Sequence, residues 1–337
     1  MSHALSVAVI QGGPSVEAEV SRSSAKAVRA ALTAEGHRVA TLELDRFLSE
    51  SLRSGGYDVA FPVSHGGLGE NGSLQGLLEV VELPYVGSAV LASALAMDKG
   101  VARVLFASAG LPVAKGRVVA RRTPLAESVS EVLATLGSAL VVKPAASGSA
   151  LGVVRLPDAT PESLAAALEN EFLTSEQALV EQFVTGAEVT CGVLDCGGEA
   201  VALPPTEVES PFDAFYTYEA RYAKGRSVHH TPARFDEPTL LEIQRLAVGA
   251  HRALGCRDLS RVDFVVGPSR EGDTASVTVL EVNTLPGFTA TSLYPEAALV
   301  QGIPFPELCN RLVLSAYHRG IGVRHVGVPL PPPHAGT

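Results

Sequence analysis

The strongest constraint on the fold is a pair of apolar stretches that each carry polar side chains at alternate positions. Arg261 and Asp263 are separated by one valine, and Glu281 and Asn283 are separated by another. Side chains of a strand alternate between its two faces, so each pair is expected to share one face of a strand whose other face is apolar. Charged groups on such strands are costly to bury without a compensating partner. Hard oxygen donors of this kind suit Mg²⁺ bridged to substrate phosphates, while ion pairs with nearby arginines are the alternative for either strand alone.

Length and composition limit the class of protein. A chain of 337 residues exceeds the roughly 250–300 residues at which a single core stops growing, so two or three domains are expected. A net charge of −10 argues against nucleic-acid binding, which needs a basic face. No apolar run reaches the roughly 18 residues of a membrane span, and the first residues lack the basic start of a signal peptide. The four cysteines lack zinc-ligand spacing and are expected to be reduced core residues of a cytosolic protein (Cys191, Cys196, Cys256 and Cys309).

The first part of the chain has the pattern of an open parallel α/β sheet. Residues 5–10 form a continuous apolar run before a Gly-Gly-Pro turn, as expected of a buried parallel strand. A helix with Ser21 as its candidate cap is expected to follow and to end at Gly36. Further strands are expected at 38–44 and 57–63, and a short helix at 73–81. Ligands bind beyond the carboxyl ends of such strands, so Glu17 and His65, which follow the first and third strands, could converge on one site.

Two further units are expected downstream, and both mix helices with strands. The second begins near Met97, with helices at 98–109 and 161–170 and strands at 139–143 and 178–184. The third opens with a hairpin of strands 189–195 and 199–203, followed by a long loop at 205–232, a helix at 238–255, the two polar-faced strands and a helix at 306–317. The proline-rich end of the chain is expected to be extended.

A lysine at a strand end precedes a loop of small residues. Lys143 is followed by small side chains up to Gly152, which would let backbone N–H groups approach phosphate oxygens closely. The loop is not a P-loop, because no GxxxxGK[ST] occurs, and no GxGxxG follows the first strand. A surface loop with a solvated lysine is the alternative. Lys99, Glu181 and Glu188 are equally ambiguous as isolated residues.

Seven blocks of sequence occur in order over about residues 1–320. They are GGPSVEAEVS (12–21), SHGGLGENGSLQGLLEVVELPYVGS (64–88), ASALAMDK (92–99), VVKPAASGSALG (141–152), FYTYEARY (215–222), SRVDF (260–264) and LEVNTLPGFTATSLYP (280–295). Taken together, these blocks resemble the D-alanine–D-alanine ligases of the ATP-grasp superfamily, and the combination of the first, fifth and last is highly specific.

The resemblance implies an α/β (α+β) architecture, namely an ATP-grasp fold with an N-terminal open parallel α/β domain. The implied division is an N-terminal substrate domain (1–94), a central ATP-grasp subdomain (95–184), a C-terminal ATP-grasp subdomain with the metal site (185–320) and a flexible proline-rich tail (321–337). ATP would lie between the last two folded units. The implied activity is the ATP-dependent joining of two D-alanines through a D-alanyl phosphate, for peptidoglycan precursor synthesis in the cytoplasm. A homodimer is expected, without nucleic-acid or membrane partners.

The resemblance also implies a role for individual residues. Mg²⁺, with Mn²⁺ as a substitute, would be held by Asp263, Glu281 and Asn283, in agreement with the alternation of the strands. The catalytic set would be Glu17, Ser149, Tyr222, Arg261 and Gly287; ATP would be bound by Lys99, Lys143, Glu181, Glu188, Phe215 and Arg221; and D-alanine would be bound by His65, Ser292 and Leu293. Glu17 would bind the ammonium of the first D-alanine with support from His65, while Arg261 and the Gly287 N–H would face the tetrahedral oxyanion.

Two positions depart from the usual family pattern. Relatives usually have lysine where this chain has Arg221, and their phosphate loop often has a second serine where this chain has Ala150. Charge and backbone donors are kept, so activity is expected. Members that make D-alanyl-D-lactate usually lack the tyrosine found at Tyr222, which favours an amine as the second substrate. The alternatives are a D-alanine–D-lactate or D-alanine–D-serine ligase and an inactive nucleotide or D-amino-acid binding protein.

Overall fold

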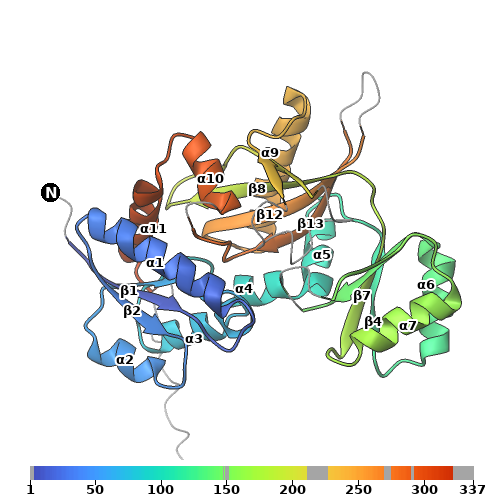
Figure 1. Cartoon of the computed structure of the whole chain (residues 1–337), viewed down its shortest axis with the longest axis horizontal. Coiled ribbons are helices and arrows are strands. Elements are labelled where there is room, and N and C mark those ends of the chain that lie inside the picture. Colours follow the sequence, from blue (N-terminus) through green and yellow to red (C-terminus); the bar gives the residue numbers. More distant parts are fainter. Residues whose placement is uncertain are drawn as a thin grey trace, which may run out of the picture.

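The computed structural model describes residues 4–146, 148, 152–210, 227–268, 275–289 and 292–321, which form three sheets with helices packed around them (Figure 1). Four residues with expected roles lie outside the described residues: Ser149, Phe215, Arg221 and Tyr222. Of the expected tail, only Ile321 is described. Among the residues that the structure describes, no helix has the combined length and hydropathy of a transmembrane segment.

The N-terminal sheet has three parallel strands in the order β2–β1–β3 (Arg38–Glu43, Ser6–Gln11 and Val59–Pro62). In β1, Val7 and Val9 belong to one core and Ala8 and Ile10 to another, so the strand is buried on both faces. Burial on both faces explains its unbroken apolar sequence and confirms the expected parallel sheet. Helices of this unit are α1 (Ala18–Ala34), α2 (Leu48–Ser54), the 3-10 turn η1 (Gly67–Gly69) and α3 (Ser73–Val80).

The expectation that Ser21 caps the first helix is wrong. Helix α1 begins at Ala18, with Glu17 as its flanking residue, so Ser21 lies within the helix. Its Oγ accepts a hydrogen bond of 2.7 Å from the N–H of Gly12, in the turn that follows β1. The Ser21 hydroxyl therefore stabilises the turn that follows β1. Because that turn leads directly into α1, the helix begins about one helical turn before Ser21.

The central sheet is antiparallel, in the order β4–β7–β5–β6 (Gly116–Ala120, Gln177–Gln182, Leu140–Pro144 and Val154–Leu156). Helices α6 (Leu125–Leu136) and α7 (Pro161–Glu171) pack against it around a separate core that includes Val132, Leu164 and Val180. Helix α7 begins with a capping box made by Thr160 and Ser163. In Figure 1 this unit lies to one side of the other two sheets.

The large sheet has the order β11–β10–β8–β12–β13, and β9 pairs with β8. Its strands are Val228–His230, Thr206–Glu209, Ala187–Asp195, Asp258–Val266 and Val277–Asn283, with β9 at Val201–Ala202. One core joins it to α4 (Val90–Met97), α5 (Lys99–Ser108) and α9 (Glu237–Ala253). The other joins it to α10 (Leu293–Val300), α11 (Phe305–Arg319) and the N-terminal sheet.

The interval 205–232 was expected to be a long loop, and this expectation is wrong at both of its ends. Strands β10 and β11 lie there and pair with each other in antiparallel register. The two strands carry Glu207, Glu209 and His230, and Arg234 forms ion pairs with both glutamates. Charges on such short strands, of which β11 lies at the edge of the sheet, leave no apolar run for a sequence pattern to detect.

A buried carboxylate ties the N-terminal sheet to the large sheet. Asp258, the first residue of β12, is completely buried with φ at 61°, and it forms an ion pair with Arg319 at the end of α11. Asp258 Oδ2 also accepts a 2.7 Å hydrogen bond from the Gly87 N–H, and Oδ1 accepts one of 3.2 Å from Ser315 Oγ. Arg319 Nη2 donates in addition to the carbonyl oxygen of Tyr85 at 2.8 Å. Three segments far apart in the sequence therefore meet at one carboxylate.

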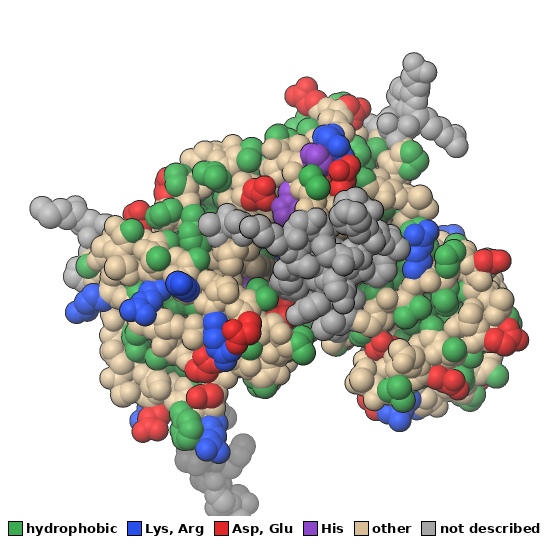
Figure 2. Space-filling view, in the orientation of Figure 1, with side chains coloured by type: hydrophobic (Ala, Val, Ile, Leu, Met, Phe, Trp, Pro, Cys, Tyr) green, Lys and Arg blue, Asp and Glu red, His purple; other side chains and the backbone are tan. Residues whose placement is uncertain are grey.

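On the face shown in Figure 2, acidic and basic side chains of the described residues are interspersed instead of gathering into a basic patch.

Candidate active site

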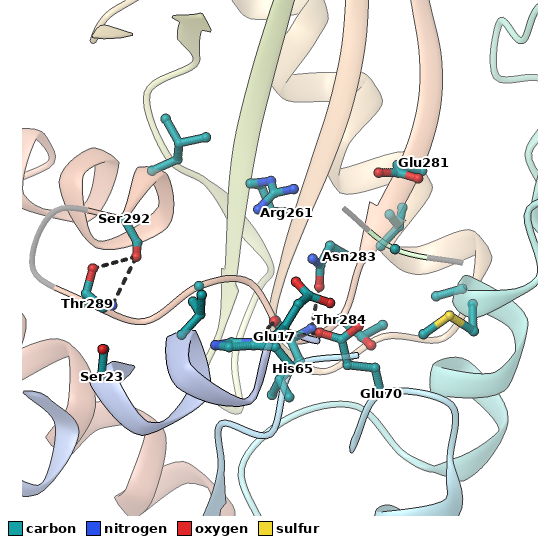
Figure 3. A pocket seen from close by; sticks show the side chains of 18 of the residues that line it. Glu17, Ser23, His65, Glu70, Arg261, Glu281, Asn283, Thr284, Thr289 and Ser292 are labelled. Carbon is teal, nitrogen blue, oxygen red and sulfur yellow. Dashed lines mark hydrogen bonds and ion pairs between the residues drawn. The ribbon is translucent and has the colours of Figure 1, made fainter. Parts of the chain in front are cut away.

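A cavity of about 310 Å³ lies where residues of the N-terminal and large sheets meet those at the start of α5. Figure 3 shows its arrangement: Ser292 and Thr289 lie at one end, Arg261 in the middle, and Asn283 and Glu281 at the other end. The N-terminal unit supplies the floor of the cavity, where Glu17, His65 and Glu70 lie (Figure 3). Of the residues expected from the sequence, the lining contains Glu17, His65, Lys99, Arg261, Glu281, Asn283, Gly287, Ser292 and Leu293.

The two polar-faced stretches are strands, as their sequences predict, and the structure shows that β12 pairs with β13 in antiparallel register. Arg261 lies opposite Asn283, and Asp263 lies opposite Glu281. Arg261 and Asp263 share one face, because the guanidinium donates through Nε and Nη2 to the two carboxylate oxygens, each at 2.8 Å. A register shift follows Asp263, which is where the regular ladder is interrupted. Arg261 lines the cavity, while Asp263 lies two residue pairs further along the strands.

Each carboxylate of this strand pair lies beside a basic side chain. The ion pair of Asp263 with Arg261 agrees with the alternative interpretation, in which nearby arginines neutralise the carboxylates. Lys99 Nζ lies 3.1 Å from Glu281 Oε2, and Arg261 forms the fork with Asp263. Over the described ranges, no group of three His, Cys, Asp or Glu side chains is placed to hold a metal ion. The donor set of two carboxylates and the Asn283 amide oxygen nevertheless fits Mg²⁺, which usually takes only one or two protein carboxylates and completes its shell with phosphate and water oxygens.

Among the described side chains that were expected to contact the phosphates and the base, Lys99 alone lines this cavity. Lys143 Nζ, at the end of β5, lies 2.6 Å from Glu181 Oε2, and Arg103 Nε lies 3.3 Å from the other oxygen of the same carboxylate. Glu188 lies on β8, in register with Val265 and Val208. The backbone N–H of Lys99 donates to the carbonyl oxygen of Ala145 at 2.8 Å. The start of α5 and the loop after Lys143 are therefore in contact.

The loops around Glu17 approach one another closely. A Cβ added to Gly66, whose φ is +78°, would lie 2.8 Å from Glu17 Oε2 and 2.4 Å from Ser15 Oγ, so only glycine fits there. A Cβ on Gly148 would lie 3.8 Å from Glu17 Oε2. Gly148 and the loop that carries Gly66 therefore both approach the Glu17 carboxylate.

His65 is buried and holds two parts of the cavity wall together. Its Nδ1 lies 3.1 Å from the carbonyl oxygen of Leu285 and 3.6 Å from Glu70 Oε1. Its Nε2 lies 3.1 Å from Ser24 Oγ, on α1. The two imidazole nitrogens thus contact protein groups of α1 and of the turn after β13. Glu17 lies beside His65 in the floor of the cavity (Figure 3).

The turn after β13 is built from local hydrogen bonds. Asn283 Oδ1 accepts a 2.8 Å bond from the Leu285 N–H, which folds the chain back after the strand. Further along, Ser292 Oγ accepts from the Thr289 N–H at 3.1 Å and lies 2.8 Å from Thr289 Oγ1 (Figure 3). Gly287 lies between these contacts, and a Cβ added to it would lie 3.1 Å from Ser292 Oγ. The three residues expected to bind or stabilise substrate groups here, Gly287, Ser292 and Leu293, lie on one side of the cavity.

Five polar residues of the lining were not anticipated as site residues: Ser23, Glu70, His229, Thr284 and Thr289. His229 Nδ1 lies 3.0 Å from Glu296 Oε2, whereas His230, on the next position of β11, pairs with Glu209. Alternation along β11 would have separated these two histidines, had the strand been predicted. Glu70 follows His65 in a Gly-rich loop after β3, and that position beyond the carboxyl end of a parallel strand was its available signal.

The lining residue Leu293 is followed by a tyrosine with a strongly shifted pKa. Burial raises the pKa of Tyr294 well above its usual value, and its hydroxyl donates to the carbonyl oxygen of Val193 at 3.0 Å. Its ring packs 5.9 Å from that of Phe288. Tyr294 therefore stays protonated and anchors the start of α10, which carries Ser292 and Leu293, onto β8.

Comparison with known protein families gives two matches on this chain. Residues 105–314 match the family model described as D-ala D-ala ligase C-terminus. Residues 45–88 match the one described as D-ala D-ala ligase N-terminus. Together they include the strands β12 and β13 and the loop that carries His65.

Individual proteins similar to this chain include a curated relative and two solved structures. The D-alanine–D-alanine ligase of Xanthobacter autotrophicus is 45% identical over 312 residues, which cover 92% of this chain and 97% of the relative. The VanG D-Ala:D-Ser ligase of Enterococcus faecalis is 31% identical with a TM-score of 0.81, covering 94% of this chain and all of that chain (100%). The D-alanine–D-alanine ligase of Bacillus anthracis complexed with ATP is 26% identical with a TM-score of 0.78, covering 94% and 98%.

Proposed function

The chain belongs to the D-alanine–D-alanine ligase family, which confirms the resemblance inferred from its sequence and the ATP-grasp fold expected from it, and on this premise we propose that it joins two D-alanines at the cavity described above. The family consists of ADP-forming ligases, so the chain is an enzyme that uses ATP. The observation that carries the proposal is the convergence of Glu17, Arg261, Glu281 and Ser292 on one cavity.

The chemistry of such a ligation explains the residue types. A carboxylate is a poor electrophile, so ATP first phosphorylates the first D-alanine to an acyl phosphate. The second amine then attacks the carbonyl carbon, a C–N bond forms, and phosphate leaves with the electrons of the C–O bond. Negative charge gathers first on the transferring phosphoryl group and then on the carbonyl oxygen, which calls for cationic and N–H donors.

We assign the donors by their positions. Arg261 lies in the middle of the cavity and Gly287 lines it, which supports the proposal that both stabilise the oxyanion. Lys99 would contact the phosphoryl oxygens, and Lys143 would do so from the end of β5. Glu17 would bind the first ammonium, while Ser292 and the backbone of Leu293 would bind the second carboxylate. For Ser149, Phe215, Arg221 and Tyr222 the assignment rests on the sequence, as does that of Glu181 and Glu188 as base and ribose contacts.

The metal assignment is Mg²⁺ held by Asp263, Glu281 and Asn283, with Mn²⁺ as a substitute. When bound, the ion would neutralise charge on the phosphate oxygens of ATP. In the same proposal Lys99 and Arg261 are the basic groups that neutralise these carboxylates between turnovers.

We further propose a cytoplasmic homodimer and the four-part division at residues 94, 184 and 320. Separate cores support the division between the central sheet and the rest. The four cysteines, none of them in a disulfide, support a reducing compartment.

The experiment that tests the proposal is mass spectrometry of products formed by the purified protein from ATP, Mg²⁺ and D-alanine, alone and with equimolar D-lactate or D-serine. We expect D-alanyl-D-alanine to dominate every mixture, together with ADP. A dominant depsipeptide or D-alanyl-D-serine would replace the proposal with the corresponding alternative ligase. Background ADP release with every D-amino acid would favour an inactive binding protein.

A further inference from the structure

Ser24 is a completely buried serine within α1 whose hydroxyl contacts two groups outside its own helix. Its Oγ lies 3.1 Å from Nε2 of His65 and 3.4 Å from the backbone N of Phe288. His65 in turn lies 3.1 Å from the carbonyl oxygen of Leu285 through Nδ1. The buried Ser24 hydroxyl therefore links the loop after β3 of the N-terminal sheet to the turn after β13 of the large sheet.

The chemistry of the partners fixes the direction of these hydrogen bonds. The Leu285 carbonyl can only accept, so His65 Nδ1 carries a proton. In the neutral ring Nε2 is then an acceptor, and the Ser24 hydroxyl donates to it. The Ser24 oxygen accepts the N–H of Phe288, which cannot do anything but donate. Each group in this chain of hydrogen bonds can therefore be assigned as a donor or an acceptor without conflict.

The two ends of the chain of bonds bracket Gly287. Leu285 and Phe288 lie on either side of the Pro286–Gly287 peptide, and Leu285 is also held by Asn283 Oδ1 through its own N–H. The turn thus has one attachment to β13 and two to the N-terminal unit. Ser24 makes one of the two hydrogen bonds to the N-terminal unit and bonds the histidine that makes the other. The Phe288 ring also packs 5.5 Å from that of Phe61, on β3.

We propose that Ser24 is a positioning residue that fixes the backbone of residues 285–288 and so aims the Gly287 N–H at the reacting carbonyl oxygen. This inference rests on the proposed function, in which that N–H stabilises the oxyanion. Removing one such donor typically lowers the rate by on the order of 10²–10³-fold. A donor that is displaced but still present loses part of that effect, so removal of the Ser24 hydroxyl should lower kcat by about tenfold.

The kinetic experiment compares Ser24→Ala and Ser24→Cys with the wild-type enzyme, with Ser93→Ala as the matched control. Ser93 is also a buried helical serine, 1% exposed, and its Oγ bonds the Ser88 carbonyl oxygen at 3.4 Å, away from the turn. The cysteine keeps the volume of serine but is a weak donor and acceptor, so it separates packing from hydrogen bonding. We expect both Ser24 variants to lose about tenfold in kcat with little change in the KM for ATP, and Ser93→Ala to retain the wild-type kcat.

A spectroscopic experiment tests the chain of bonds without relying on activity. In ¹⁵N-labelled protein, the imidazole signals of His65, assigned by their loss in His65→Gln, should show a protonated Nδ1 and an unprotonated, hydrogen-bonded Nε2. In Ser24→Ala the Nε2 signal should shift, because its donor is gone, while Ser93→Ala should leave it unchanged.

These outcomes separate the inference from the function on which it rests. If the wild-type protein makes no D-alanyl-D-alanine, the proposed function fails, whatever the histidine spectrum shows. If the wild type is active but Ser24→Cys keeps its full kcat, or Ser93→Ala loses as much as Ser24→Ala, Ser24 has no positioning role. An Nδ1 without a proton in the wild-type spectrum would also overturn the inference.

Discussion

Asp263 and Glu281 lie directly opposite each other on the antiparallel strands β12 and β13. Like charges in this relationship destabilise a sheet, and the structure places one basic group beside each: Arg261 at Asp263 and Lys99 at Glu281. The strand pair therefore keeps two negative charges together, and Glu281 lines the cavity. In the proposed function, a divalent cation would relieve the repulsion between them.

Glu281→Gln should nearly abolish ligation and leave the fold intact. The substitution keeps the shape of the side chain but removes one charge from the pair. Because metal-derived charge stabilisation is worth several kcal/mol, kcat should fall by about 10²–10³-fold. The measurement is the rate of ADP formation against Mg²⁺ concentration, with the thermal midpoint as the check on folding. Glu176→Gln, which alters an exposed ion pair with Arg121, is the control; a wild-type rate in Glu281→Gln would refute the metal assignment.

Arg261→Lys should lower kcat by on the order of 10²–10³-fold, since an ammonium cannot reproduce the two-bond fork to Asp263 and loses the donor aimed into the cavity. Arg234→Lys is a matched control, because Arg234 forms a similar fork with Glu207 outside the cavity. Steady-state kinetics with saturating ATP and D-alanine would check both variants. Equal losses in the two would mean that the fork has only a structural role.

Asp258→Asn should destabilise the whole protein. Asp258 is fully buried, and the substitution would leave Arg319 without its counter-charge, a change that costs about 3–5 kcal/mol for a buried pair. The Arg319 side chain is 24% exposed, so the lower end of that range, about 3 kcal/mol, is expected. Urea unfolding followed by circular dichroism would measure it. A loss below about 1 kcal/mol, the size of a surface ion pair, would contradict the interpretation.

The cysteines should be unreactive in the native protein near neutral pH. Burial raises the pKa of Cys256 to about 11 and that of Cys196 to about 12, and it raises the pKa of Cys191 and Cys309 further. At pH 8 a thiol reagent should therefore label none of the four before unfolding and all four in denaturant. One thiol that titrates at pH 8 in the native protein would disprove this expectation.

The same shifts predict how stability changes with pH. Unfolded thiols ionise near about pH 8.5, whereas the folded thiols stay protonated to higher pH. Their contribution to stability is thus complete below about pH 8.5 and decreases as the pH rises above it. Urea midpoints measured from pH 7 to pH 10 would show the decrease, and replacement of Cys191 by alanine should reduce its slope.

Much of the fold and part of the site could be predicted because their signals are local. The unbroken apolar run of β1 and the alternation in β12 and β13 follow from burial on two faces or on one. Strands β10 and β11 escaped prediction because they are short and charged, and β11 also lies at the edge of the sheet. Contacts between distant segments, such as those of His65 with Ser24 and of Asp258 with Arg319, leave no periodic trace. Local sequence patterns therefore predicted many of the residues that line the cavity. The contacts between their side chains became known only from the structure.

The packing of α11 has a consequence for the order in which this protein is made. Val28 and Leu32 of α1 share one core with Leu308 and Leu312 of α11, so the first and last helices described cover each other's apolar faces. A ribosome synthesises α1 long before α11, and during that interval the N-terminal sheet has an uncovered apolar side. We therefore expect the nascent chain to depend on chaperones until α11 has left the exit tunnel, and premature stop codons before Phe305 to yield insoluble product.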